Sequence, residues 1–287
     1  MRTYFYLILC LLLSLYSCED IIDPDGLLDN NESLVIINSF IAPQSDVIAV
    51  KVSRTEFIIG QPINDFSVDN KFAITNAIVS ITDEDGASVD LPYSENNFRY
   101  QIMASDFSIV EGKRYFLKVI VNEKEFNASC RIPDKRIQSI SELLSDKEDD
   151  DKGSVKVVKV RFDDITETQN FYIVGAKIEN TDPNIFISRN SFDFESDRFA
   201  TDNLGDGTTI SSEGILRKND FLSGNILKLQ VANVEQILYQ SLLASYLNSQ
   251  SEGSPVEEVI IPPNNILETG GYGVFAGFQL TEKEITF

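Results

Sequence analysis

The feature that most constrains the fold is a series of short segments rich in Val, Ile, Phe and Tyr, separated by Gly, Pro, Asn and Asp. Between residues 34 and 134 these segments are LVIINSFI, VIAVKVSR, AIVSITDEDG, FRYQI, RYFLKVIV and KEFNASCRI. β-Branched and aromatic residues favour strands, and strands at this spacing are typical of two packed antiparallel sheets. We therefore predict an immunoglobulin-like β-sandwich domain over residues 34–134, with Gly86 of the DEDG turn at positive φ.

Residues 135–287 form the predicted second domain, which is also rich in β-strands. VKVVKVRFDD, FYIVGAKIE and ILKLQVAN alternate as strands do, whereas residues 234–249 carry apolar side chains three and four apart and predict one α-helix. The charge run at 146–152 is typical of a solvated loop, and residues 180–225 are typical of long loops. After residue 261 we expect a loop, a Gly-rich bend and two short strands. The predicted fold class is mostly β: two antiparallel β-sandwich-like domains with one helix in the C-terminal half.

The amino terminus predicts export. The apolar run from Tyr4 to Tyr16 follows a single positive charge at Arg2. A membrane-spanning helix needs about 20 apolar residues, and nothing apolar continues this run after Ser17. The pattern is typical of a signal peptide and disfavours a signal anchor.

The end of this segment predicts a lipid anchor. Ser17 precedes Cys18, with Leu15 three places before the cysteine, and this order resembles the bacterial lipobox. We predict a signal peptide over residues 1–17, with a diacylglycerol thioether and an N-acyl chain on Cys18, followed by an acidic tether over residues 18–33. Such acyl chains hold a protein on a membrane without a spanning helix. The alternative is a secreted protein with a cysteine at its cleavage site by chance.

Charge and cysteine content narrow the possible partners. The net charge of −21 becomes −22 once Arg2 leaves with the signal peptide. Binding to nucleic acid or to an anionic bilayer through the protein surface needs clustered Lys and Arg, so both are disfavoured. With Cys10 removed and Cys18 acylated, only Cys130 remains, and no internal disulfide can form. Its position at the end of an alternating strand predicts a small buried apolar side chain rather than a reactive thiol.

The chain contains no histidine and no tryptophan. This excludes Ser-His-Asp and Cys-His catalysis and histidine-based zinc sites. A pair of carboxylates could still hydrolyse a glycosidic bond, but sugar-cleaving sites usually stack the sugar on tryptophan. We predict no enzymatic activity, no catalytic residue and no cofactor besides the lipid.

Acid-rich turns are the remaining candidates for a metal site. Asp83 and Asp85 form one cluster, and Asp202 and Asp206 form another, each with a glycine nearby. Neither matches the spaced ligands of an EF-hand, so a hairpin turn and a solvated loop are favoured over calcium. TGGYGVFAGF near the end of the chain has glycines spaced as in a phosphate loop, but no lysine. We favour the interpretation that these glycines let the strand bend or let the helix lie close to it.

Taken in order, these segments resemble a family of bacterial lipoproteins from the Bacteroidota, catalogued as domain of unknown function 4249. The resemblance rests on the lipobox and acidic tether, LVIINSFI, IVSITDEDGASVDL and EGKRYFLKVIVNEKEFNASCRIP in the first half. In the second half it rests on ILYQSLLASYLNSQ, PPNNILETGGYGVF and FAGFQLTEKEITF. It covers about the whole chain, although residues 180–225 match poorly.

The resemblance implies a role beside a partner in the outer membrane. Such lipoproteins are commonly found beside TonB-dependent transporters, so a non-enzymatic accessory that helps in capture or assembly is the expectation. Glu19 and Asp20 resemble the export signal that sends lipoproteins of this group to the cell surface. The alternatives are an independent binding module for a peptide or glycan, and a carboxylate-dependent hydrolase.

Overall fold

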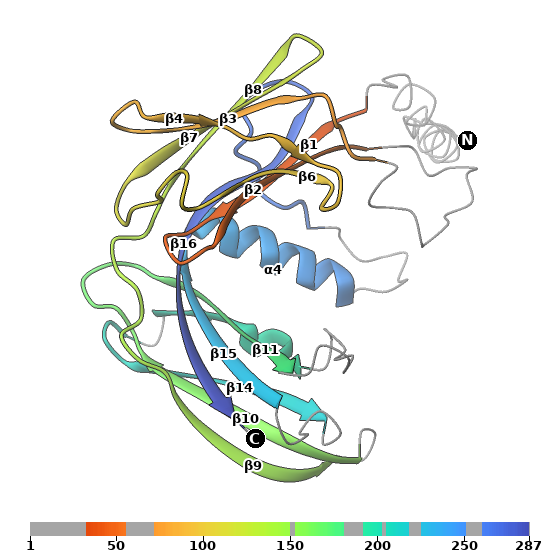
Figure 1. The fold of residues 1–287 in the computed structure, drawn as a ribbon. Coiled ribbons are helices and arrows are strands. Elements are labelled where there is room, and N and C mark those ends of the chain that lie inside the picture. The colour runs from red at the N-terminus through yellow and green to blue at the C-terminus, as the bar shows by residue number, and fades with distance from the viewer. Residues whose placement is uncertain are drawn as a thin grey trace, which may run out of the picture. The chain divides into compact units, whose positions relative to one another are not determined.

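The computed structural model describes residues 33–55, 72–149, 153–180, 192–202, 205–217, 225–250 and 260–286. The predicted signal peptide and most of the tether, with Cys18, Glu19 and Asp20, lie outside these residues. Residues 34–287 form one compact unit. The fold is mostly β, with several antiparallel sheets and one α-helix in the C-terminal half, as predicted (Figure 1).

The first half of the unit is a sandwich of two sheet layers. Its strands are β1 (Val35–Ile41), β2 (Val47–Arg54), β3 (Ile78–Asp83), β4 (Ser88–Asp90), β5 (Tyr93–Ser94), β6 (Arg99–Met103), β7 (Arg114–Val121) and β8 (Lys124–Arg131). The order β4-β3-β7-β8 makes one layer, and β1-β2-β6-β5 belongs to the other. Ile37, Val50 and Tyr100 of the second layer meet Leu117 and Phe126 of the first in one buried cluster. Gly86 has φ 90°, as the DEDG turn predicted.

The second half encloses a separate buried cluster. Its elements are β9 (Ser141–Asp149), β10 (Gly153–Asp163), β11 (Phe171–Asn180), β12 (Phe192–Asp193), the 3-10 helix η1 (Glu195–Arg198), β13 (Phe199–Thr201), β14 (Thr209–Arg217), β15 (Asn225–Val234), α4 (Gln236–Gln250) and β16 (Gly271–Thr286). The sheet β12-β14-β10-β9 contributes Val158 and Ile210, and the sheet β13-β11-β15-β16 contributes Tyr172 and Leu229. Two layers again enclose the apolar side chains.

One strand, β16, belongs to both halves. Residues 271–277 pair in parallel with β1, and residues 278–286 pair antiparallel with β15. The boundary predicted at residue 134 therefore separates the two buried clusters but does not interrupt the sheet, whose order is β13-β11-β15-β16-β1-β2-β6-β5. The expectation of two short strands after residue 261 is wrong. A single 16-residue strand spans this region because its two ends pair with different neighbours.

Two segments expected to be loops are strands. β14 lies in the region predicted as long loops. Its inward residues include Ser212 as well as Ile210 and Leu216, and this polar residue weakens the apolar alternation by which a strand is predicted. β9 contains the first part of the charge run 146–152, and its Asp146 accepts a hydrogen bond from Lys156 of β10 at 2.7 Å. Charged side chains are common on edge strands, where they discourage pairing with another chain.

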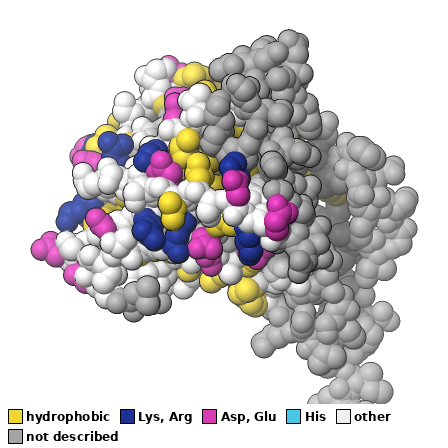
Figure 2. Space-filling model, turned by 90° about the horizontal axis from the view of Figure 1, so that it is seen from below, with side chains coloured by type: hydrophobic (Ala, Val, Ile, Leu, Met, Phe, Trp, Pro, Cys, Tyr) yellow, Lys and Arg dark blue, Asp and Glu magenta, His cyan; other side chains and the backbone are white. Residues whose placement is uncertain are grey.

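The charged side chains of this half are interleaved by sign. Lys159 pairs with Glu213 at 3.0 Å, and Lys283 pairs with Glu142. Seen from below, on the side where β9 and β10 lie in Figure 1, Lys and Arg alternate with Asp and Glu among a few apolar side chains (Figure 2). Exposed pairs of this kind each contribute about 0–1 kcal/mol, so they shape the surface potential more than the stability.

The predicted helix is confirmed as α4. It packs on β11 and β16, where Leu238 meets Val274 and Ala276 in a third buried cluster. The ring of Tyr239 lies 5.3 Å from that of Phe171, and Tyr246 lies 5.6 Å from Phe199, measured between centroids. Both tyrosines therefore pack within the molecule.

Three buried tyrosines each hold a preceding loop through the phenol oxygen. Tyr100 accepts a hydrogen bond from the Ala77 amide at 2.7 Å, and Tyr115 accepts one from Val110 at 2.7 Å. Tyr172 accepts from the Ile165 amide at 2.9 Å and donates to the Asp164 carboxylate. Burial and this hydrogen bond to Asp164 raise the pKa of Tyr172. The arrangement is similar in principle to the tyrosine corner of immunoglobulin-like sandwiches.

The glycines of β16 close the sheet. Gly273 has φ 134°, and a Cβ there would lie 2.0 Å from the Ile37 carbonyl oxygen of β1. A Cβ on Gly277 would lie 2.6 Å from the Arg131 carbonyl oxygen at the end of β8. These close contacts are with β1 and β8, and α4 is not among them.

We predict that Gly273→Ala lowers the free energy of unfolding by about 3 kcal/mol or more, because the methyl group collides with β1 and the φ is strained. The control is Gly175→Ala in β11, where a Cβ would have no neighbour within 4 Å among the described residues. Alanine there should change the stability by at most about 1 kcal/mol. Urea titrations of both variants measure the difference, and equal stabilities would contradict the closing role of Gly273.

Candidate functional site

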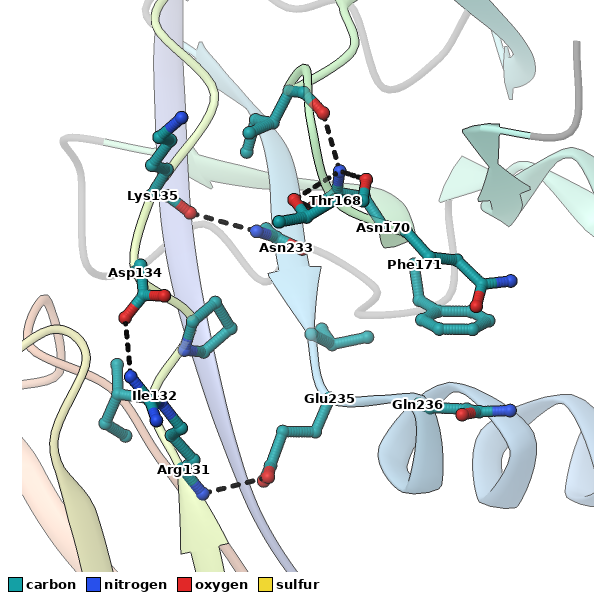
Figure 3. A pocket seen from close by; sticks show the side chains of 14 residues that line it. Arg131, Ile132, Asp134, Lys135, Thr168, Asn170, Phe171, Asn233, Glu235 and Gln236 are labelled. Atoms are coloured by element: carbon teal, nitrogen blue, oxygen red, sulfur yellow. Dashed lines mark hydrogen bonds and ion pairs between the residues drawn. The ribbon is translucent and has the colours of Figure 1, made fainter. Parts of the chain in front are cut away.

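A pocket that combines apolar walls with convergent polar groups lies at the junction of the two halves, within the single compact unit. This junction pocket holds about 400 Å3. Three segments line it: residues 131–135 after β8, residues 165–171 before and at the start of β11, and residues 233–236 where β15 passes into α4. Figure 3 shows their side chains converging from these segments.

Glu235 is the central acidic group of the pocket. It stands between β15 and α4, and its carbonyl accepts the first helical hydrogen bonds, from Leu238 at 3.0 Å and Tyr239 at 3.2 Å. Its side chain points toward Arg131 in Figure 3, and Oε1 accepts a hydrogen bond from the Arg131 amide at 2.8 Å. Oε2 accepts from the Gly277 amide at 2.7 Å. One carboxylate thus joins β8, β16 and the start of α4.

Burial raises the pKa of Glu235, and the hydrogen bonds from Gly277 and Arg131 offset only part of that effect. A raised pKa in a pocket is compatible with acid-base work. Here, however, both oxygens already accept backbone N–H groups. The geometry therefore favours a structural role for Glu235.

Further side chains tie the segment after β8 to β15 and β16. Asn233 donates to the Lys135 carbonyl at 2.9 Å, Gln279 to the Pro133 carbonyl at 2.5 Å, and Thr281 to the Ile137 carbonyl at 2.6 Å. Asn233 and Gln279 are buried. A buried amide is stable only when it is hydrogen-bonded, so these contacts define one position for the connecting segment.

The wall formed by residues 165–171 is held in the same way. Asn170, which is buried, donates to the carbonyls of Ile165 and Thr168. Asp164 accepts from the Tyr172 phenol at 2.6 Å and from the Gly207 amide at 3.0 Å. The polar groups of the junction pocket thus fix backbone, and the space they enclose is suited to a small polar group or a partner loop.

The carboxylates predicted as weak calcium ligands also bond to the protein. Asp83 accepts from the amides of Asp85 and Ala87, and Lys113 pairs with both Asp83 and Asp85. Burial acts against ionisation of Asp83, but hydrogen bonds from Ala87 and Lys113 outweigh it and hold its pKa below the usual value. The DEDG segment is a hairpin turn fixed by a lysine.

In the second cluster, Asp202 accepts from the Asn170 amide at 3.2 Å, and Asp206 accepts from the Glu167 amide at 3.0 Å. Both carboxylates thereby support one wall of the junction pocket. Among the described residues, no group of three carboxylate or thiol side chains could hold a metal ion.

Cys130 is buried, as its place in the strand predicted, and is 3% exposed. Burial raises the pKa of its thiol, which keeps the sulfur protonated and unreactive. The glycines of TGGYGVFAGF lie in β16 against β1 and β8, as described above, and so pack backbone closely.

Sequence reasoning missed Glu235, Asn233 and Gln279. Their signal is faint: single polar residues within the apolar segments QVANVEQIL and FAGFQL. A lone polar residue in a run that is otherwise buried suggests a side chain with a backbone partner, but it does not identify that partner.

Comparison with protein families identifies the family of this chain. A family described as domain of unknown function (DUF4249) matches residues 19–284. The chain belongs to this family. The DUF4249 match thus includes both halves of the unit and every lining residue of the junction pocket. A comparison with curated proteins finds no match.

Among the described residues, no helix has the length and apolar character needed to span a membrane.

We predict a pH signature for Glu235. Because its pKa is raised in the folded state, its contribution to stability is greatest below the unfolded pKa of about 4.3 and is lost as the pH rises through the folded value. The stability of the wild type relative to Glu235→Gln should therefore fall as the pH rises above the unfolded pKa of about 4.3. Urea titrations across this range provide the measurement.

The control for the change in net charge is Glu213→Gln, which removes an exposed carboxylate of β14. If both variants give the same pH dependence relative to the wild type, the burial of Glu235 has no such effect.

Proposed function

We propose that the mature protein is a lipid-anchored, non-enzymatic accessory of the outer membrane that works with a TonB-dependent transporter in capture or assembly. The observation that carries the anchor is the position of Cys18. It ends a signal-like segment at a lipobox, and the family match begins at the next residue, Glu19. The part shared with the family therefore corresponds to the predicted mature protein.

The proposal that the protein is not an enzyme is supported by the hydrogen bonds that its carboxylates already make. The central carboxylate of the junction pocket is occupied by backbone N–H donors, and the described carboxylate clusters hold turns. A protein whose polar side chains mainly fix its own backbone presents a stable surface, which suits binding or assembly. Glu19 and Asp20 support placement on the cell surface, which leaves the body of the protein available to a partner.

The second candidate is an independent binding module for a peptide or glycan. It is favoured by a second cavity of about 410 Å3, distinct from the junction pocket in its lining residues. The two functions differ in what must co-purify with the protein.

Lipidation is tested by Cys18→Ser in the cell of origin. Loss of the thiol removes the attachment atom, so labelling with a radioactive fatty acid should disappear and the protein should leave the membrane fraction. Cys10→Ser is the matched control, since it removes a thiol from the same amino-terminal region without changing the lipobox. Continued labelling of the Cys18→Ser protein would contradict the anchor.

The partnership is tested by isolating the C-terminally tagged wild-type protein in mild detergent and identifying what accompanies it. We expect a β-barrel transporter in stoichiometric amount, retained when the salt concentration is raised moderately. An unrelated lipoprotein with the same tag controls for general membrane contamination. Recovery of the protein without any transporter would contradict the accessory role.

A further inference from the structure

A second groove lies on the outward face of the first-half sheet. It holds about 410 Å3 and is lined by Asn38, Ser39, Phe40, Ala49, Lys51, Asn97, Phe98 and Arg99. These residues come from β1, β2, the start of β6 and the turn before it. We call this the β1–β2–β6 groove. Among the residues that the structure describes, it shares no lining residue with the junction pocket.

The lining of this groove differs in charge from the chain as a whole. The chain has 45 acidic and 24 basic residues, yet the described residues that line the groove include two cations, Lys51 and Arg99, and no acid. Lys51 lies opposite Asn38 in the β1–β2 ladder, so both side chains stand on the same face of the sheet. The guanidinium of Arg99 thus lines this groove on a chain whose net charge is −21.

Arg99 is already oriented. Its Nε donates to Oε1 of Gln101 at 2.7 Å, and Gln101 is neutral. The hydrogen bond fixes the guanidinium plane through one nitrogen and leaves its outer N–H groups for a ligand. Planar guanidinium groups of this kind pair with carboxylates through two parallel hydrogen bonds.

The aromatic side chains of the groove are not part of the interior. Phe40 is 40% exposed, and neither Phe40 nor Phe98 belongs to a hydrophobic cluster of the described residues. Phe98 also has φ 49°, in the left-handed region. A bulky side chain there costs about 1–2 kcal/mol relative to ordinary backbone. Glycine or asparagine would adopt this backbone conformation with less strain. The strain at Phe98 is not offset by packing of its ring in a described hydrophobic cluster.

The shape of the site restricts its occupant. β2 pairs with β1 on one side and β6 on the other, so no open strand edge is present in the groove for an extended peptide to join. The site is a sheet face with aromatic rings, amides and cations at its borders. A sugar ring fits these groups: its C–H face stacks on an aromatic ring, its hydroxyls bond to amides, and an acidic substituent meets a guanidinium.

We propose that the β1–β2–β6 groove binds an acidic saccharide, with a uronate carboxylate on Arg99 and a sugar face on Phe98 and Phe40. The volume of about 410 Å3 is within the range of small-molecule sites. The amides of Asn97 and Asn38 border the position of the ring hydroxyls. Saccharide binding by this groove requires neither the lipid anchor nor the transporter, so its test is independent of both.

The test uses the detergent-solubilised mature protein and calorimetric titration with short oligogalacturonate and oligomannuronate. We expect binding of at least one of them, weakened by salt because the contact is ionic. Methyl esterification of the same oligosaccharide removes the charge and keeps the ring, and it should weaken binding at least about tenfold. Equal affinity for the acid and the ester, or no binding of either oligosaccharide, would overturn the proposal.

Variants separate the groove from general effects. Arg99→Gln should weaken binding about tenfold or more, whereas Lys118→Gln, which removes an exposed cation from β7, should leave it unchanged. Phe98→Asn should weaken binding while the stability to urea stays equal or rises, because asparagine tolerates the left-handed backbone. If Arg99→Gln and Phe98→Asn bind as the wild type does, the site is elsewhere. Binding of tetraglutamate in preference to the saccharides would assign the groove to an acidic peptide and overturn the proposal.

Discussion

The structure depends on one contact between distant parts of the chain: the parallel pairing of β1 with the first half of β16. The two strands are about 236 residues apart in sequence, as the hydrogen bond from the Val274 amide to Asn38 shows. Parallel neighbours have no tight turn between them, so the whole intervening chain must be ordered around this pair. Because β16 continues into the antiparallel pairing with β15, the same strand fixes the second half against the first. A pairing so distant in sequence predicts slow folding.

The polar contacts around the junction pocket follow from this arrangement. Where β16 passes from one neighbour to the other, the end of β8 and the start of α4 approach its backbone. The amides of Arg131 in β8 and Gly277 in β16 need an acceptor there. Glu235 supplies acceptors to Arg131 and Gly277, and Gln279 donates to Pro133. A buried backbone amide or carbonyl without a hydrogen bond costs about 1–3 kcal/mol, so each of these side chains supplies a partner that the strand ladder does not. This arrangement buries the Glu235 carboxylate, which raises its pKa.

Most strands of the first half could be predicted from the sequence, because each buries one face and alternates accordingly, as β7 does in RYFLKVIV. β16 could not, for a physical reason. Residues 273–277 are buried on both faces, between the first core and α4, whereas residues 281–286 alternate between partly buried and exposed. The pattern therefore changes within one strand and suggests two. The wall of the junction pocket was equally hidden, since Glu235 and Asn233 act on backbone groups that are distant in sequence.

The two cavities show how a site used by the fold differs from one available to a ligand. In the junction pocket, polar side chains end on carbonyls and amides of the same chain, and removing one would expose an unsatisfied backbone group. In the β1–β2–β6 groove, the two phenylalanines lie outside every cluster of the described core, and Phe98 is held in a conformation that costs free energy. Natural chains retain strain chiefly where it serves a purpose beyond folding. The β1–β2–β6 groove is therefore the site that we propose for a ligand, because the polar side chains of the junction pocket already bond to backbone groups of the same chain.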